Sequence, residues 1–444
     1  MSDETGSSVA QPTIQPLSNA WRRYALILLF TISVLNFLDR QIVNILAEDI
    51  RNELGLRDWQ IGALTGLAFA VFYSILGVPI ARIAERGHRP RIIAASLIVW
   101  SAFTAVCGMA QTFAQFALAR VGVGVGEAGC TPPAHSLISD YVPREKRASA
   151  LAFFAMGGPV GGLLGLAIGG LVSDHWGWRA AFVVVAIPGV IFGLIASLTL
   201  PEPRRTQMIG IAPVARSSLL TAFKELRACR TYWLFVSATT MMAVVSYGHS
   251  SFLASFFLRN HAPGLGGMAA SFGLQATGFL GLTVGLITGV GGVLGALVGG
   301  QLADKVASKS ARGYASLAAF AALMGVPTYI AAMMAPSTPL ALGLLFLPHF
   351  VFNLSLGSMY AVPQSVVRPQ LRATAVAIML LSTNLIGLGV GPLLVGIYSD
   401  HLQAGGMTDG DAIRTAQIVI TLFGLLAAGL YWHARKYIEA DMVS

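Results

Sequence analysis

Charged residues are scarce in this sequence. Asp, Glu, Lys and Arg make up 11% of its 444 residues, hydrophobic residues make up 55%, and the mean hydropathy is +0.69. Soluble domains carry charge on about a quarter of their residues, so this composition excludes a water-soluble globular protein. The short alternating segments typical of outer-membrane barrels are also missing. The composition therefore predicts a helical membrane protein.

Cysteine and acidic residues are also scarce, with three cysteines and 20 Asp and Glu residues in the chain. Cys107, Cys130 and Cys229 cannot form a disulfide framework, and no grouping of His, Cys, Asp and Glu or of Ser, His and Asp has the spacing of a metal site or a hydrolase. We therefore predict a protein that is not an enzyme and needs no cofactor or metal. The net charge of +9 comes from bases dispersed between apolar runs, which argues against a nucleic-acid partner.

Long apolar runs dominate what remains. A membrane-spanning helix needs about 20 apolar residues, and twelve windows meet this requirement: 24–47, 60–81, 91–110, 113–136, 148–172, 180–200, 232–257, 277–302, 313–334, 339–362, 373–398 and 414–433. The connections between them are too short for a folded domain. We predict an all-α polytopic protein with twelve transmembrane helices in two pseudo-symmetric six-helix bundles.

Lys and Arg alternate between the connections. Most of them lie on one set of connections, and the other set holds only Arg51, Arg57, Arg179, Arg259 and Arg414. Under the positive-inside rule, the basic set and both termini are cytoplasmic. The first 20 residues have no apolar core or cleavage site, so residues 1–20 are expected to be a disordered cytoplasmic tail and not a signal peptide. The predicted location is the cytoplasmic (inner) membrane.

The longest connection divides the twelve windows into two sets of six. The predicted N-terminal bundle is residues 21–200, the cytoplasmic linker 201–231, the C-terminal bundle 232–436 and the C-terminal tail 437–444. Within the linker, Leu219, Leu220, Phe223 and Leu226 recur at helical spacing opposite basic residues. This pattern suits a helix on the inner membrane surface, although a plain linker helix also fits.

Three motifs occur once in each half. Arg147-Ala-Ser-Ala-Leu-Ala152 recurs as Arg372-Ala-Thr-Ala-Val-Ala377, Gly170–His175 recurs as Gly396–His401, and Ala81–Arg86 corresponds to Gly300–Lys305. The motifs recur at similar offsets of 225, 226 and 219 positions, close to half of the 444 residues, which predicts two halves in the same orientation. Parallel repeats of this kind build transporters whose central site opens to either side of the membrane.

The repeated loops carry the predicted inner gate. They pair Glu85 with Arg86 and Asp304 with Lys305 at cytoplasmic helix ends, where an acid can accept hydrogen bonds from a neighbouring helix N-terminus. The repeated Arg147 and Arg372 belong to the same gate. For Arg89 and Arg91 we expect solvated loop positions instead.

Small residues recur every fourth position in four windows, a spacing that lets helix backbones approach closely. The stripes are Gly62 and Gly66; Gly161, Gly165 and Gly169; Gly291, Gly295 and Gly299; and Gly387 and Gly391. Because they fall in windows two, five, eight and eleven, we expect smooth surfaces on which the two halves rock.

Four ionisable residues lie inside the apolar windows of the first half. Asp39 and Arg40 are in the first window, and Arg120 and Glu127 are in the fourth. A charge in the membrane costs at least about 2.5–3.5 kcal/mol, so it normally faces the bundle interior. Asp39 and Arg40 point about 100° apart on their helix and cannot pair face to face. Each charge therefore needs a partner from another helix, and we predict a cross-helix cluster of two acids and two bases.

These features together resemble the major facilitator superfamily over essentially the whole chain. Asn36-Phe-Leu-Asp-Arg40 and Gly124-Val-Gly-Glu-Ala128 are similar to the Spinster branch, whose members carry sphingolipid phosphates and lysophospholipids. The resemblance implies that Asp39 and Glu127 take up protons. It also implies that Arg120 anchors the substrate head group, with Arg40 and Asn36 beside it.

Other polar residues in the windows are weaker candidates for the substrate site: His249, His349, Asn353 and Asn384. The predicted function is proton-coupled, alternating-access transport of an amphipathic anion or zwitterion by a monomer in the lipid bilayer. Two alternatives stay open. A symporter of small organic anions should have a closed polar cavity, and an intramembrane lipid-modifying enzyme needs a catalytic constellation that the sequence does not offer.

Overall fold

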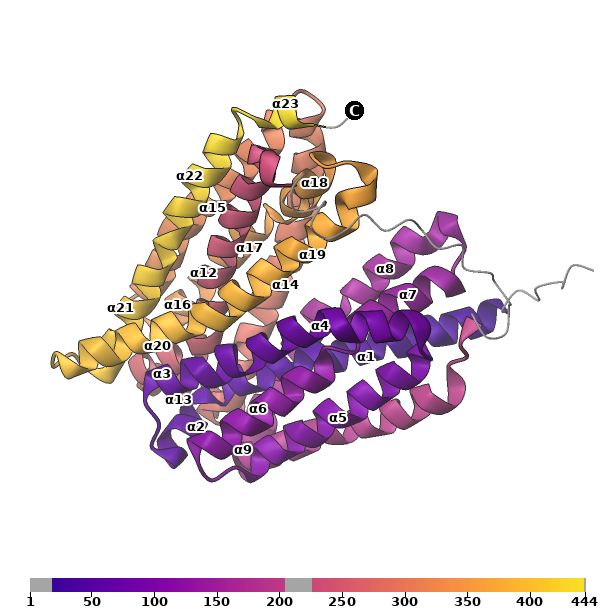
Figure 1. Cartoon of the computed structure of the whole chain (residues 1–444). Helices are drawn as coiled ribbons and strands as arrows, with labels where there is room; N and C mark the ends of the chain where they lie inside the picture. Colours follow the sequence, from indigo (N-terminus) through magenta and orange to yellow (C-terminus); the bar gives the residue numbers. More distant parts are fainter. Residues whose placement is uncertain (1–17, 204–225, 443–444) are drawn as a thin grey trace, which may run out of the picture.

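The computed structural model describes residues 18–203 and 226–442. The first half of the described chain is built from helices (Figure 1), which are α1 (Asn19–Ile45), α2 (Ala47–Leu54), α3 (Asp58–Gly62), the π-helix η1 (Ala63–Leu67), α4 (Ala68–Arg86), α5 (Arg89–Met109), α6 (Phe113–Glu127), α7 (Thr131–Tyr141), the 3₁₀ turn η2 (Arg144–Lys146), α8 (Arg147–Ala155) and α9 (Gly157–Thr199).

The second half has a similar order of elements. Its helices are α12 (Arg230–Asn260), α13 (Ala262–Ser271), α14 (Ala276–Ala307), α15 (Arg312–Met333), α16 (Thr338–Leu344), α17 (Phe346–Asn353), α18 (Leu356–Ser365), the 3₁₀ turn η3 (Pro369–Leu371), α19 (Arg372–Ser382), the π-helix η4 (Thr383–Leu388), α20 (Gly389–Ala404), α21 (Asp409–Thr421), α22 (Phe423–Ala434) and α23 (Ile438–Asp441).

The described helices make the predicted twelve crossings in two bundles. Ten segments are individually long and apolar enough to span a membrane, and one of them, Ser149–Thr199, contains two crossings. It is broken at Gly177, whose φ of 80° is in the left-handed region that favours glycine. The fourth crossing is split into α6 and α7, because Pro132 and Pro133 have no N–H to continue the hydrogen-bond ladder. The split leaves Glu127 at the end of α6.

The two bundles meet mainly along two helix pairs. The α3–η1 segment packs against α20, and the first half of α9 packs against α14. Glycines make these approaches possible: a Cβ on Gly62 or Gly170 would lie under 3.0 Å from the backbone of the other bundle. Of the four predicted stripes, only the one at Gly62 and Gly66 lies at this close approach of the two bundles, and the rocking itself stays a prediction.

The other three glycine stripes pack inside their own bundles, contrary to our expectation. Gly161 and Gly165 contact α1, Gly295 and Gly299 contact α17 and Leu354, and Gly387 and Gly391 contact α12. Glycines that face the other bundle occur at other positions on the same helices, among them Gly170, Gly281 and Gly396. Spacing reveals that a helix has a smooth face, but it does not reveal which neighbour covers that face.

Gly62 offers a direct test of this interface. We expect Gly62→Ala to lower stability by about 1–3 kcal/mol, because the new methyl group would overlap the Pro392 carbonyl in the other bundle. Gly77→Ala in the same crossing is the matched control, since nothing lies within 4 Å of its Cβ position. Thermal unfolding of the two purified variants measures the difference. Equal unfolding temperatures would contradict the close approach.

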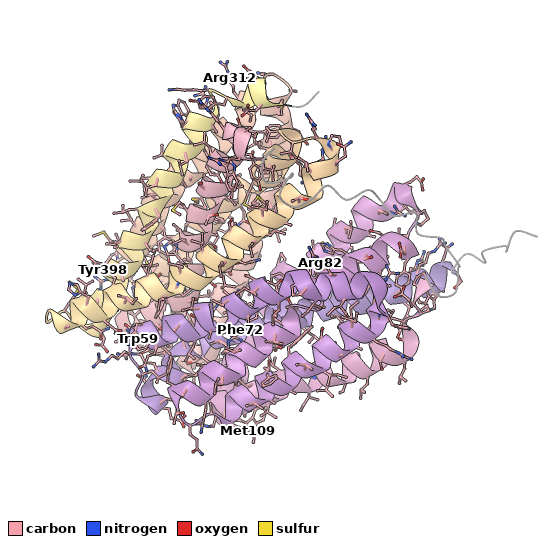
Figure 2. All side chains as sticks on the ribbon, viewed as in Figure 1. Trp59, Phe72, Arg82, Met109, Arg312 and Tyr398 are labelled. Carbon is pink, nitrogen blue, oxygen red and sulfur yellow. The ribbon has the colours of Figure 1, made fainter. Side chains whose placement is uncertain are left out.

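The bundles meet at one end of the molecule and diverge at the other. In Figure 2, Trp59 on α3 and Tyr398 on α20 mark the end where they meet, and Arg82 and Arg312 lie on separate bundles toward the diverging end. The last described helix, α23, lies at the diverging end in Figure 1. Most of the predicted tail 1–20 and the predicted interfacial helix of the linker fall outside the described residues.

Arg89 contradicts the expected solvated position. Its side chain is fully buried, contacts both carboxylate oxygens of Glu202 and forms an ion pair of 2.6 Å with Asp140. Its backbone N–H donates to Glu202 Oε2 over 2.8 Å. The start of the linker folds back onto α5 and α7 and supplies the acid, so this base is a buried ionic clamp.

Candidate functional site

The four predicted charges gather in the first bundle. Arg40 on α1 donates through Nε to Glu127 Oε2 on α6 over 2.7 Å. Glu127 is fully buried, and Arg40 retains 15% of its side-chain surface. This pair realises the predicted cross-helix contact directly.

The other two charges have polar partners that are not acids or bases. Thr104 Oγ1 on α5 donates to Asp39 Oδ2 over 3.2 Å, and Arg120 Nε donates to the Leu64 carbonyl over 3.2 Å. Leu64 belongs to the π-helix η1, where wider hydrogen-bond spacing alters the backbone ladder. Each partner is a neutral group, so the cluster is one ion pair flanked by a lone acid and a lone base.

Aromatic rings line the bases. The Arg40 guanidinium lies 4.8 Å from the ring centre of Phe69 and 4.5 Å from that of Tyr73, and Arg120 lies 5.2 Å from Phe69. A ring face attracts a cation and excludes water from it. Phe69 thus holds both guanidinium groups against one surface without neutralising either.

Two polar atoms of the cluster, one acceptor and one donor, make no hydrogen bond of accepted geometry with any described residue. Glu127 Oε1 and Asn36 Nδ2 are buried, and neither has a hydrogen-bond partner among the described residues. An unsatisfied buried polar atom is costly, at about 1–3 kcal/mol. The site therefore has spare hydrogen-bonding capacity beside Glu127.

A polar contact joins this region to the second bundle. Asn44 Nδ2 on α1 donates to Gln41 Oε1 over 2.8 Å and to Ser250 Oγ on α12 over 3.2 Å. Ser250 lies next to His249, which faces a cavity of about 170 Å³ in the second bundle. The cavity is also lined by the predicted residues His349 and Asn353, but Asn384, half-buried on η4, is not among its lining residues.

The predicted gate residues lie at the diverging end. Asp304 and Lys305 are exposed. Arg147 Nε donates to the carbonyl of Val142, just after α7, and Arg372 Nε donates to that of Gln364, near the end of α18. The side chains of Glu85 and Arg86 lie outside the described part of the structure. The latch across this end stays a prediction.

Sequence reasoning missed a network at the end where the bundles meet. Arg259 on α12 donates to Asp58 Oδ1 over 2.7 Å and Oδ2 over 2.9 Å, and to Glu48 Oε2 over 2.9 Å. Asp58 also accepts from Ser399 Oγ over 2.6 Å. Asp58 is fully buried, and these bonds connect the two bundles.

Two helix caps of the same form flank that network. Asp400 on α20 accepts from the backbone N–H groups of Asp58 over 3.0 Å and Trp59 over 2.9 Å. Asp174 on α9 accepts from those of Gln275 and Gly278, each over 3.0 Å. Each carboxylate satisfies free N–H groups at the start of a helix in the opposite bundle.

A sequence signal for these caps existed. Asp174 and Asp400 occupy the same place in the repeated motifs Gly170–His175 and Gly396–His401. The repeat establishes that the two acids are equivalent, but their targets lie 101 and 342 positions away along the chain. Only the packing of the bundles identifies those targets.

Comparison with known proteins identifies the architecture. The profile of the Major Facilitator Superfamily matches residues 29–392. The chain belongs to the major facilitator superfamily. It is 30% identical to an MFS-type efflux pump of Mycolicibacterium smegmatis, over 96% of this chain and 94% of that protein. It is 25% identical to protein spinster homolog 1 of Xenopus tropicalis, over 94% of this chain and 81% of that one.

A solved structure agrees with these relatives. A bacterial homolog to the human lysosomal transporter Spinster, in an inward-facing and unoccupied conformation, superposes with a TM-score of 0.85 at 31% identity, over 96% of this chain and all of that one. The protein is a Spinster-like membrane transporter of the major facilitator superfamily. As a major facilitator, it places its buried charges on α1 and α6 within one of the two bundles between which such transporters build their substrate site.

Proposed function

We propose that this Spinster-like transporter couples proton movement to the passage of an amphipathic anion or zwitterion by alternating access. The observation that carries the proposal is the buried Arg40–Glu127 pair of 2.7 Å, with Glu127 Oε1 left without a partner among the described residues. A carboxylate held by one base is a group whose protonation depends on that base.

The net charge of the four-residue cluster couples substrate binding to proton uptake. With all four groups ionised the cluster is neutral, and protonation of both acids leaves two guanidinium groups to bind a phosphate or carboxylate. An anion that pairs with Arg40 withdraws the partner of Glu127 and favours proton uptake there. A zwitterion differs, since its ammonium competes with the proton for Asp39 or Glu127, and exchange results.

Orientation follows from the same proposal. If the basic connections and both termini face the cytoplasm, the diverging end is cytoplasmic and the structure represents an inward-facing state in the inner membrane. The Asp304 and Lys305 loops would then close on the other bundle after substrate leaves. The uncharged cavity of the second bundle supplies a second contact for the substrate.

A transport experiment tests the proposal. Purified protein is reconstituted into vesicles that contain a pH-sensitive dye, and sphingosine 1-phosphate, a lysophosphatidylcholine or galacturonate is added under an imposed pH gradient. We expect substrate-dependent proton movement with the amphipathic compounds. Proton movement with galacturonate alone would favour the symporter of small organic anions, and no proton movement with any compound would contradict the coupling.

A further inference from the structure

The cavity in the second bundle has a distinctive polar lining. It lies between α12, α15, α17 and the junction of α21 and α22. Its polar lining residues are Ser246, His249, Tyr329, His349, Asn353 and Thr421, and the rest of the lining is apolar. The described residues around it include no Asp, Glu, Lys or Arg. Neutral groups, chiefly the two histidines with Asn353 and Ser246, therefore decide which hydrogen bonds the cavity offers.

The hydrogen bonds of His249 fix which of its nitrogens carries the proton. Its Nε2 lies 2.9 Å from Thr421 Oγ1 and 3.3 Å from the Gln417 carbonyl. The Thr421 hydroxyl donates its only proton to that same carbonyl over 2.7 Å, so it can only accept from the imidazole. The Gln417 carbonyl can only accept, so hydrogen on Nε2 satisfies both contacts, and in the neutral ring Nδ1 is then a bare acceptor.

The ring of His249 is held rigidly in this state. It stacks on Tyr329 at an interplanar angle of 3°, and the Tyr329 hydroxyl donates to Gln417 Oε1 over 2.5 Å. His249 is 8% exposed, and no described residue donates to its Nδ1. The bare nitrogen is thus fixed in place and free to accept a hydrogen bond.

His349 reaches a similar state through its other nitrogen. Its Nδ1 lies 3.0 Å from the Leu345 carbonyl, which can only accept, so Nδ1 carries the hydrogen and Nε2 is bare. Asn353 Nδ2 donates to the His349 carbonyl over 2.8 Å, which leaves Asn353 Oδ1 as a third acceptor. A charged imidazolium at either position would be buried without an acid in the lining, so both rings are neutral.

We infer that this cavity is a binding subsite for an uncharged, hydroxyl-bearing group of the substrate. His249 Nδ1, His349 Nε2 and Asn353 Oδ1 are acceptors to which no described residue donates. The cavity therefore selects a ligand that supplies hydrogen-bond donors. A hydroxyl supplies a donor without bringing a charge, whereas an ammonium would be buried with no counter-ion. That the bound group belongs to the transported molecule rests on the proposed function, whereas the binding of such a group to the cavity does not depend on transport.

The size of the cavity limits the group. An engineered protein cavity of about 150 Å³ holds a benzene molecule, so about 170 Å³ accommodates one six-membered ring or an equally small branched alcohol. Gly325 also lines the cavity, and nothing lies within 4 Å of its Cβ position. A larger side chain there can fill the space without displacing the backbone.

Nitrogen NMR of the full chain in lipid nanodiscs tests the inference. Histidine side chains are labelled with ¹⁵N and assigned with His249→Phe and His349→Phe. The probes are cyclohexanol, methoxycyclohexane and cyclohexylammonium. We expect hydrogen on Nε2 of His249 and on Nδ1 of His349, and a saturable shift of both bare nitrogens with cyclohexanol. Cyclohexanol should bind at least about fivefold more tightly than methoxycyclohexane, the worth of one hydrogen bond.

Gly325→Val is expected to abolish the cyclohexanol shift while leaving the protein folded by its thermal unfolding profile. The inference is overturned if the histidines have the opposite tautomers, if cyclohexylammonium binds more tightly than cyclohexanol, if methoxycyclohexane binds equally well, or if the shift survives in Gly325→Val. None of these results bears on proton coupling, which the vesicle assay tests separately.

Discussion

Glu127→Gln is expected to abolish the pH dependence of transport and to lower the initial rate under an inward pH gradient at least about tenfold, which corresponds to about 1.4 kcal/mol. The substitution keeps the shape of the side chain and removes its charge. Arg40 then loses the carboxylate that it contacts over 2.7 Å and is free to bind an anionic head group in every state. Binding without proton release retains the substrate and slows the cycle.

Asp39→Asn is expected to reduce the pH dependence as well, since Asp39 is 3% exposed and accepts one hydrogen bond, from Thr104. The matched control is Glu145→Gln, at an exposed carboxylate on η2 outside the cluster. The measurement is the initial rate in reconstituted vesicles across a series of pH values. Unaltered pH profiles in both cluster variants, with normal reconstitution, would remove the proposed coupling.

Arg259→Met is expected to open the end at which the bundles meet. Arg259 has 6% of its side chain exposed and binds two buried acids of the first bundle, Glu48 and Asp58. Removal of one partner from a buried ion pair costs about 3–5 kcal/mol, and we expect the lower end of this range because Glu48 and Asp58 keep Arg51 of their own bundle as a charged partner. The closed arrangement contains those bonds and the open one does not, so the closed-to-open ratio should fall by about a hundredfold or more.

Spin labels at Asn52 and Met407, which are exposed and belong to different bundles, report this opening as a longer distance between the labels. Arg312→Met is the control, because Arg312 is exposed and its ion pair with Glu439 lies inside the second bundle. An unchanged distance distribution in Arg259→Met would show that the network does not hold this end closed. The caps at Asp174 and Asp400 would then be the main contacts between the bundles.

The expected effects at the charge cluster and at the end where the bundles meet have different origins. At the cluster, the charges belong to one bundle and can change protonation without separating the halves. At the closed end, the charges belong to both bundles and must separate for the transporter to open. The first set is therefore suited to coupling and the second to holding one conformation.

Much of the site could be predicted from the free-energy cost of placing a charge inside the membrane. Asp39, Arg40, Arg120 and Glu127 stood out because a charge inside an apolar window needs a partner, and their grouping in one bundle could be predicted. The choice of partner could not. The sequence does not show that Glu127 takes Arg40, that Thr104 serves Asp39, or that a π-helix presents the Leu64 carbonyl to Arg120.

By itself, the sequence determined the number of crossings, the two repeated halves and the residues whose burial demands an explanation, because hydrophobic length and charge cost act locally along the chain. The tertiary structure alone decided which glycine faces which helix, that Arg89 is buried, and that Arg259 links the bundles. Those outcomes depend on surfaces brought together from residues hundreds of positions apart. Such contacts follow from the relative placement of the helices, which local periodicity does not encode.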